Sequence, residues 1–272
     1  MDFSKLFPQA TAWVEGLPKM WPFLYLQNIY APFGAIHLVG MALLGGCILL
    51  INLRLLNTGV TSQTPSGVER NLRVWQLLGA VIVLGTGIII GALNSAKLFY
   101  STAFLAKMIA MAAALLFTFG VCNAVARADG KVPAGARIVA VIAVGLWLVS
   151  MWIFSTTKGL NPGVFHVVTG AFAILMILGG VSRLAAAVAF GALTIGFLAV
   201  YAVIGFDNGD QVYQDMSRWG VVAASVILAV LLALQIGRKG PDAPGAFARM
   251  IAVFSILSWI TVAAGGRWIG FS

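Results

Sequence analysis

Charged side chains are scarce in this chain: Asp, Glu, Lys and Arg make up 9% of its 272 residues, whereas 61% are hydrophobic. The mean hydropathy is +0.99. A folded chain of this composition has too little polar surface to cover a water-soluble globule, whereas lipid accepts it. The composition therefore excludes an ordinary soluble domain and predicts a polytopic membrane protein.

Cysteine is nearly absent as well. Cys47 and Cys122 both lie within apolar runs, and no C-x-x-C or C-x-x-C-H spacing occurs. This excludes a disulfide framework and covalent attachment of a c-type haem, and it favours two small buried thiols. The formal charge is +9, but no basic face with interleaved aromatic residues accompanies it, so no nucleic acid is expected as a partner.

Long apolar runs dominate what is present. Each has about the twenty residues that a helix needs to cross ~30 Å of hydrocarbon. They lack the alternation of a barrel strand, and in lipid each backbone amide must be bonded within its own segment. The sequence predicts an all-α polytopic bundle in a lipid bilayer, with eight transmembrane helices over residues 31–56, 74–95, 102–125, 137–157, 163–184, 187–206, 216–236 and 247–266.

Basic residues gather on one side of the expected bundle. The loops after the first, third, fifth and seventh spans carry Arg54, Arg70, Arg73, Arg127, Lys131, Arg137, Arg183, Arg238, Lys239 and Arg249. Cytoplasmic loops of membrane proteins are rich in Lys and Arg, and the opposite side is nearly balanced in charge here. The pattern predicts a multi-pass protein of the bacterial inner membrane with both termini extracytoplasmic.

Residues 1–30 lack the pattern of a cleavable signal, because no early basic region precedes an apolar core. Trp13, Met20 and Trp21 stand among polar residues there. Indole rings are favoured at the membrane interface. We expect an extracytoplasmic, interfacial N-terminal segment, although a plain connector fits nearly as well.

The chain contains an internal duplication. In each copy a glycine precedes a histidine by three residues, and sixteen residues separate that histidine from an arginine. The first copy has Gly34, His37 and Arg54, and the second has Gly163, His166 and Arg183. Likewise Arg137 precedes Trp147 by ten residues, as Arg249 precedes Trp259. The sequence thus predicts two parallel four-helix repeats, residues 31–157 and 158–272, related by an axis along the membrane normal.

The two histidines, His37 and His166, are the only ones in the chain. Each lies about 26 Å from its cytoplasmic arginine at 1.5 Å per residue, so the repeat places both near the outer interface. Ionisable side chains inside a membrane are functional candidates. Two facing imidazoles can ligate one haem b iron, covered by apolar helices.

Other residues fit this interpretation. Small residues beside the histidines would let a flat macrocycle approach the backbone, and cations at the same depth would hold its propionates. The predicted cofactor site comprises His37 and His166 as metal ligands with Gly34, Gly40, Gly163, Gly170, Lys107, Arg218 and Arg267.

Alternatives stay open. The histidines could only form hydrogen bonds with neighbouring helices. Met41 lies one turn after His37, so a copper site of imidazole and thioether ligands is a second interpretation. A solute permease needs polar groups at the midplane, and the scarcity of charge in the middle of these spans weakens that interpretation. A purely structural subunit needs no polar groups there.

Three stretches carry a resemblance: IHLVGMALLGGCILLINLRLL from Ile36, AFLAKM from Ala103, and ARMIAVFSILSWITVAAGGRWIGF from Ala248. The chain resembles an uncharacterised family of bacterial inner-membrane proteins, similar in pattern to the membrane domains of CopD-type copper-resistance proteins and to membrane b-type cytochromes. The resemblance implies electron transfer or copper handling. Diheme cytochromes b need four histidines, so at most one bis-His haem fits here.

One haem near the outer face leaves most of the bilayer without a redox centre. We therefore expect electron exchange on one side, between the quinone pool and an extracytoplasmic dehydrogenase or c-type cytochrome. The chain would serve as an electron-transfer subunit of a complex rather than a stand-alone enzyme.

Overall fold

The computed structural model describes residues 2–157, 170, 187–188, 191–192 and 244–270, and within these residues all regular secondary structure is helical. Five helices there are long and apolar enough to cross a membrane: Phe23–Leu55, Pro65–Leu93, Thr102–Arg127, Ala134–Phe154 and Ala246–Trp268. They confirm the all-α class and correspond to the first four and the last of the expected spans. The spans expected over 163–184, 187–206 and 216–236 lie almost wholly outside the described residues, so the count of eight and the repeat architecture stay predictions.

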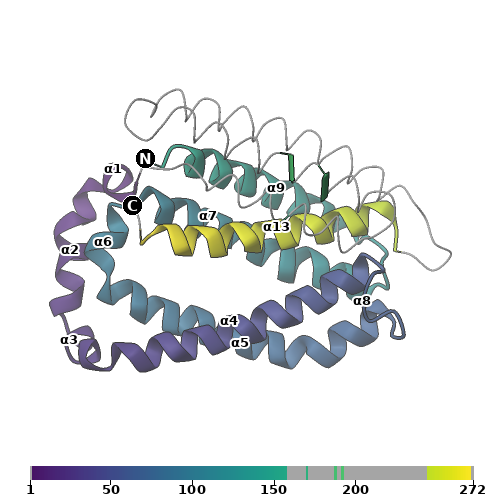
Figure 1. The fold of residues 1–272 in the computed structure, drawn as a ribbon, viewed down its shortest axis with the longest axis horizontal. Coiled ribbons are helices and arrows are strands. Elements are labelled where there is room, and N and C mark those ends of the chain that lie inside the picture. The colour runs from purple at the N-terminus through teal and green to yellow at the C-terminus, as the bar shows by residue number, and fades with distance from the viewer. Residues whose placement is uncertain (1, 158–169, 171–186, 189–190, 193–243, 271–272) are drawn as a thin grey trace.

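Short helices form the N-terminal segment and run across one end of the long helices (Figure 1). The segment is tied to α6 (Ser95–Phe99), where Ser95 Oγ donates to the Val14 carbonyl at 2.6 Å. Nearby, Tyr100 Oη donates to Glu15 Oε1 at 2.7 Å. The segment comprises α1 (Phe3–Leu6), a 3₁₀ turn (Pro8–Ala10), α2 (Thr11–Gly16), a 3₁₀ turn (Leu17–Lys19), α3 (Phe23–Leu26) and a 3₁₀ turn (Gln27–Ile29).

Two long antiparallel helices, α4 (Tyr30–Leu55) and α5 (Pro65–Leu93), pack closely against each other. Glycines permit the approach: a Cβ on Gly79 would lie 2.7 Å from the Leu44 backbone nitrogen. On the other helix, a Cβ on Gly40 would lie 2.6 Å from Ile82 Cγ2. Larger residues at these positions would push the two helices apart.

Helix α5 begins at Pro65, nine residues before the apolar run that starts at 74. Thr64 caps it, because its side chain accepts a hydrogen bond from the Gly67 amide at 3.1 Å, and proline suits the first helical turn. The helix therefore extends nine residues ahead of the apolar span expected from 74. An apolar run marks the stretch that prefers lipid, whereas the cap decides where the helix begins.

The third span is not uniformly α-helical. It consists of α7 (Thr102–Leu115), a π-helical stretch (Leu116–Cys122) and α8 (Asn123–Arg127). The next described helices are α9 (Ala134–Ser155) and α13 (Ala246–Trp268).

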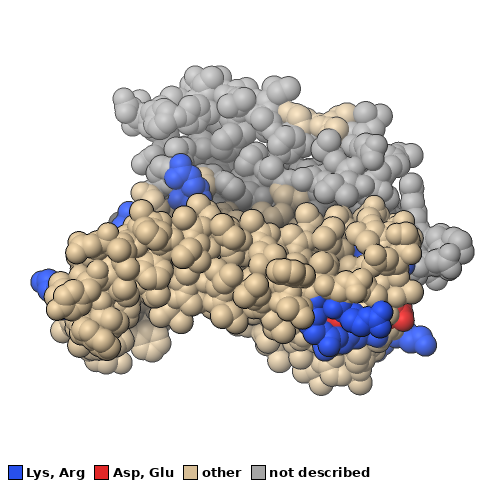
Figure 2. Space-filling view, turned by 90° about the horizontal axis from the view of Figure 1, so that it is seen from below, with Lys and Arg blue, Asp and Glu red and all other residues tan. Residues whose placement is uncertain are grey.

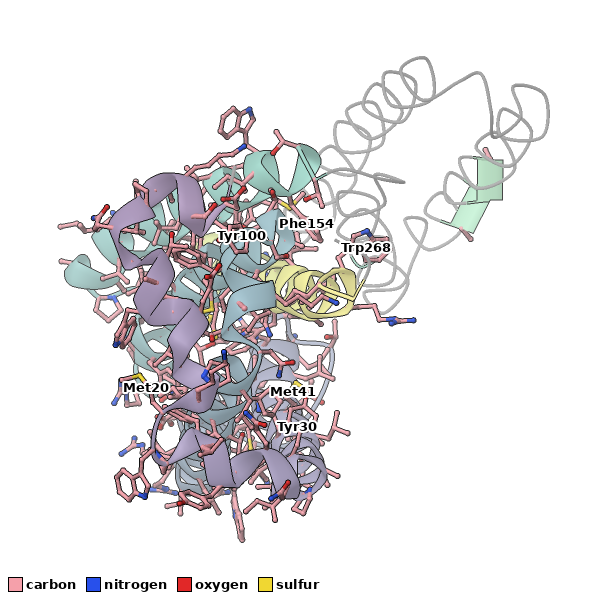
Figure 3. All side chains as sticks on the ribbon, turned by 90° about the vertical axis from the view of Figure 1, so that its left-hand side faces the viewer. Met20, Tyr30, Met41, Tyr100, Phe154 and Trp268 are labelled. Carbon is pink, nitrogen blue, oxygen red and sulfur yellow. The ribbon has the colours of Figure 1, made fainter. Side chains whose placement is uncertain are left out.

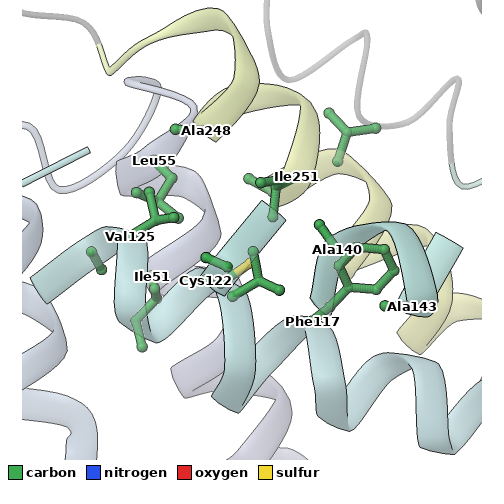
Figure 4. Close-up of a cluster of buried hydrophobic side chains, with 14 of the residues drawn as sticks. Ile51, Leu55, Phe117, Cys122, Val125, Ala140, Ala143, Ala248 and Ile251 are labelled. Carbon is green, nitrogen blue, oxygen red and sulfur yellow. The ribbon is translucent and has the colours of Figure 1, made fainter. Parts of the chain in front are cut away.

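The main hydrophobic core lies where α4, the third span, α9 and α13 meet (Figure 4). Phe117, which is fully buried, stacks on Phe254 of α13 with ring centroids 6.3 Å apart. Two indoles add hydrogen bonds between helices: Trp147 Nε1 donates to Thr261 Oγ1 at 3.0 Å, and Trp259 Nε1 donates to Thr118 Oγ1 at 2.9 Å. These bonds fix helices that are far apart in sequence.

The two ends of the bundle differ in charge. Lys and Arg side chains gather at the end where α5 begins and α8 ends, which we call the basic end (Figure 2). There Glu69, 1% exposed, accepts a bidentate hydrogen bond from Arg73 at 3.0 and 2.7 Å and lies 4.0 Å from Arg127. The opposite end, where α4 begins and α5 ends, holds α1 and the end of α13 (Figure 1); we call it the histidine end.

Candidate functional site

His37 and Thr86 meet at the histidine end. His37 is seven residues beyond the start of α4 and Thr86 is seven before the end of α5. Because these helices are antiparallel, both residues lie at one depth, about 10 Å inside the helix ends at 1.5 Å per residue. His37 Nδ1 lies 2.8 Å from Thr86 Oγ1, a hydrogen-bonding distance.

The direction of this bond follows from the other partner of the threonine. Thr86 Oγ1 lies 2.6 Å from the Ile82 carbonyl, which can only accept. A hydroxyl has one hydrogen, so Thr86 donates to Ile82 and accepts from His37. This arrangement favours a proton on His37 Nδ1 and a lone pair on Nε2.

Glycines around His37 fall into two groups. A Cβ on Gly87 would lie 3.4 Å from His37 Cε1, so this residue of α5 borders the imidazole edge. Gly34, one turn before His37, has open space where its Cβ would be. Gly40, in contrast, packs on Ile82 of α5, and Gly170 packs on Ile260 of α13, so these two serve helix contacts.

Lys107 is one of the cations predicted from sequence. It stands in α7 within electrostatic reach of His37. Its stem packs on α13, since a Cβ on Gly265 would lie 2.9 Å from Lys107 Cβ and one on Gly266 would lie 3.6 Å from Nζ. Arg267 follows in the last turn of α13, at the same end of the bundle. His166, Gly163 and Arg218 lie outside the described residues.

Seen from the histidine end, Met41 of α4 and Trp268 of α13 lie on the side of the bundle opposite Met20 (Figure 3). Met41 is 44% exposed and stands one turn after His37. Within the described ranges, no three His, Cys, Asp or Glu side chains gather to hold a metal ion. The described part of the site therefore offers a single imidazole ligand with a thioether nearby.

Sequence reasoning missed Thr86. A signal for it exists, since Thr86 is the only polar side chain between 77 and 93. In the structure Thr86 lies seven residues before the end of α5, as His37 lies seven residues beyond the start of α4. A polar residue at matching depth on the next antiparallel helix is a natural partner for an intramembrane histidine.

Comparison with known proteins gives one informative match. The model of a family of unknown function (DUF6644) matches residues 23–160, about half of the chain, including the His37 helix and the whole of α5. No curated protein and no solved structure matches the chain.

Proposed function

We propose that this chain, which belongs to the DUF6644 family, is a membrane b-type cytochrome with one haem b held between His37 and His166. The observation that supports this most strongly is the state of His37. Thr86 is placed to accept a proton from Nδ1, and this would leave Nε2 with its lone pair for a metal. Metal-ligating histidines almost always donate their other ring N–H in this way.

The residues around His37 fit the group. An axial ligand must be a neutral imidazole with one unprotonated nitrogen, and a porphyrin face needs apolar, uncrowded surroundings. Gly34 leaves open space one turn away, and Ile36 and Leu38 beside His37 are 47% and 62% exposed. When bound, haem supplies a one-electron couple in the membrane.

Two cations at this end of the bundle could neutralise the propionates of such a cofactor. Lys107 lies within electrostatic reach of His37, and Arg267 belongs to the same end of the bundle. A lysine inside an apolar span costs free energy unless an anion or water accompanies it. We assign Lys107 the task of neutralising a propionate, with Arg267 and Arg218 as further candidates.

The wider role follows from the expected topology. We propose eight spans in two parallel repeats in the bacterial inner membrane, with the basic end cytoplasmic and the histidine end outside. A single haem near the outer face would exchange electrons between quinone and an extracytoplasmic dehydrogenase or c-type cytochrome.

Copper handling is the second candidate, and the position of Met41 favours it. An exposed thioether one turn after a lone-pair imidazole is a plausible soft-ligand pair for Cu(I). This candidate predicts copper in the purified protein, lost in a Met41→Leu variant, whereas the cytochrome keeps its haem in that variant.

The test uses His37→Ala, His166→Ala and Met41→Leu variants of the full chain, expressed with ample haem. The oxidised and reduced visible spectra are recorded beside copper analysis. We expect a six-coordinate b-type spectrum in the wild type and in Met41→Leu. Either histidine variant should lose the haem or become five-coordinate. A haem spectrum unchanged in both histidine variants would refute the assigned ligands.

A further inference from the structure

We propose that Thr86 is a positioning residue that holds His37 in the Nδ1–H tautomer and so reserves Nε2 for the iron. The consequence for iron rests on the function proposed above, whereas the tautomer does not. The inference is carried by a chain of two hydrogen bonds, from His37 to Thr86 at 2.8 Å and from Thr86 to the Ile82 carbonyl at 2.6 Å.

The threonine is itself held in place. A threonine in a helix can bond the carbonyl four residues earlier, and this back-bond selects its side-chain rotamer. Thr86 is only 8% exposed, and Ile82 is its i−4 residue. Because its one hydrogen is committed to Ile82, the oxygen can present only lone pairs to the histidine. An imidazole in this position is stabilised with its proton on Nδ1.

The hydrogen bonds also reinforce each other. A hydroxyl that donates becomes a better acceptor, and the effect grows in a low-dielectric interior. A stronger bond at Nδ1–H makes Nε2 more basic, which favours the ferric over the ferrous state of a bound iron. Thr86 thus tunes the ligand without touching the metal.

Valine at position 86 is the matched probe, because it keeps the shape of threonine and removes the oxygen. We expect Thr86→Val to weaken ferric haem binding by about tenfold to a hundredfold, as for other partners of metal-bound histidines. If ferrous binding stays unchanged, each tenfold loss raises the one-electron midpoint potential by about 59 mV. Thr86→Ser keeps the hydroxyl and should keep both quantities.

The decisive measurement is nitrogen NMR of the haem-free full chain labelled with ¹⁵N-histidine, in lipid. With only two histidines in the sequence, a His166→Gln variant leaves the ring signals of His37 alone. We expect a protonated Nδ1 and an unprotonated Nε2 in the wild-type and serine forms. Thr86→Val should shift the ring toward the Nε2–H tautomer. Thr86→Ala is the second variant if the valine form does not fold.

The outcomes separate this inference from the function it extends. Nε2–H in the wild type, or an Nδ1–H signal unaltered in both the valine and the alanine forms, would overturn the positioning role even if haem is bound. The expected tautomers in a protein that never takes up haem would sustain the positioning role and refute the cytochrome.

Discussion

The two halves of α4 differ sharply, although both consist of apolar residues. The second half buries most of its inward side chains, among them Leu44, Ile48, Ile51 and Leu55. In the first half, Gly40 is the only buried residue, while Leu38 and Val39 are 62% and 64% exposed. His37 lies in the open half and Arg54 in the packed half.

The difference separates structure from chemistry. The packed half belongs to a core in which aromatic rings, small residues and hydrogen-bonded indoles fix the helices. Tightly packed interiors leave no room for a ligand. The open half presents a polarised imidazole beside exposed apolar side chains, which suits the approach of a large flat cofactor. We therefore expect changes in the packed half to cost stability and changes in the open half to alter binding.

The largest expected effect on stability is at Phe117. Phe117→Ala removes a fully buried ring that stacks on Phe254. We expect unfolding to become easier by about 3 kcal/mol, from the cavity that remains. Reversible unfolding in mixed micelles measures it. Haem per folded chain should not change; a selective loss of haem would break the distinction between the two halves.

The matched control is Leu38→Ala in the open half. This side chain is 62% exposed, so its truncation should change the unfolding free energy by less than about 0.5 kcal/mol. A loss as large as that of Phe117→Ala would mean that the open half is packed in the functional protein.

Glu69 is next. Its buried carboxylate binds Arg73, whose side chain is 45% exposed, and lies near Arg127. Glu69→Ala should cost about 2 kcal/mol, below the value for a fully buried pair, because solvent screens Arg73. Glu69→Gln keeps the shape and one acceptor and should cost less. Equal losses in the two variants would show that loss of the charge, and not loss of packing, accounts for the whole effect at this position.

Gly34 and Gly40 give a paired comparison within the open half. A methyl on Gly40 would meet Ile82 at 2.6 Å, whereas one on Gly34 meets nothing. Gly40→Ala should destabilise by about 1 to 3 kcal/mol through overpacking. Gly34→Ala should leave the haem-free protein as stable or up to ~1 kcal/mol more stable, from helix propensity. Haem titration then shows whether the Gly34 surface receives the cofactor: affinity should fall in Gly34→Ala.

The smallest effect concerns pH at the basic end. The Ser66 side chain and amide hydrogen-bond Asp129 and hold the pKa of its carboxyl below its usual value of 3.8. A carboxyl with a depressed folded pKa stabilises the fold above its unfolded pKa and loses that contribution as pH falls through the folded value. Asp129→Asn, which tolerates the local φ of +49°, should be slightly less stable at neutral pH and lose less below about pH 4. Parallel acid unfolding curves for the two proteins would contradict this.

Much of the described fold could be predicted from apolar runs alone, because lipid demands a helix of about twenty residues wherever the chain crosses. The start of α5 could not be predicted in this way, because the helix begins at the Thr64 cap and not where the apolar run begins. The π-helical stretch before Asn123 could not be predicted either, because no hydrophobic periodicity in the sequence indicates it. His37 was found because an intramembrane histidine is costly, and Thr86 could have been found as the one polar side chain between 77 and 93. Gly87 becomes meaningful only when the packing of α5 on α4 is known.

The central claim is best tested by the haem content of the purified wild-type chain, measured as pyridine haemochrome against protein concentration after expression with ample haem. The account predicts one haem b per chain, with a six-coordinate reduced-minus-oxidised spectrum. A colourless protein that binds no added haem would contradict it and would leave the His37 and Thr86 pair as a structural hydrogen bond.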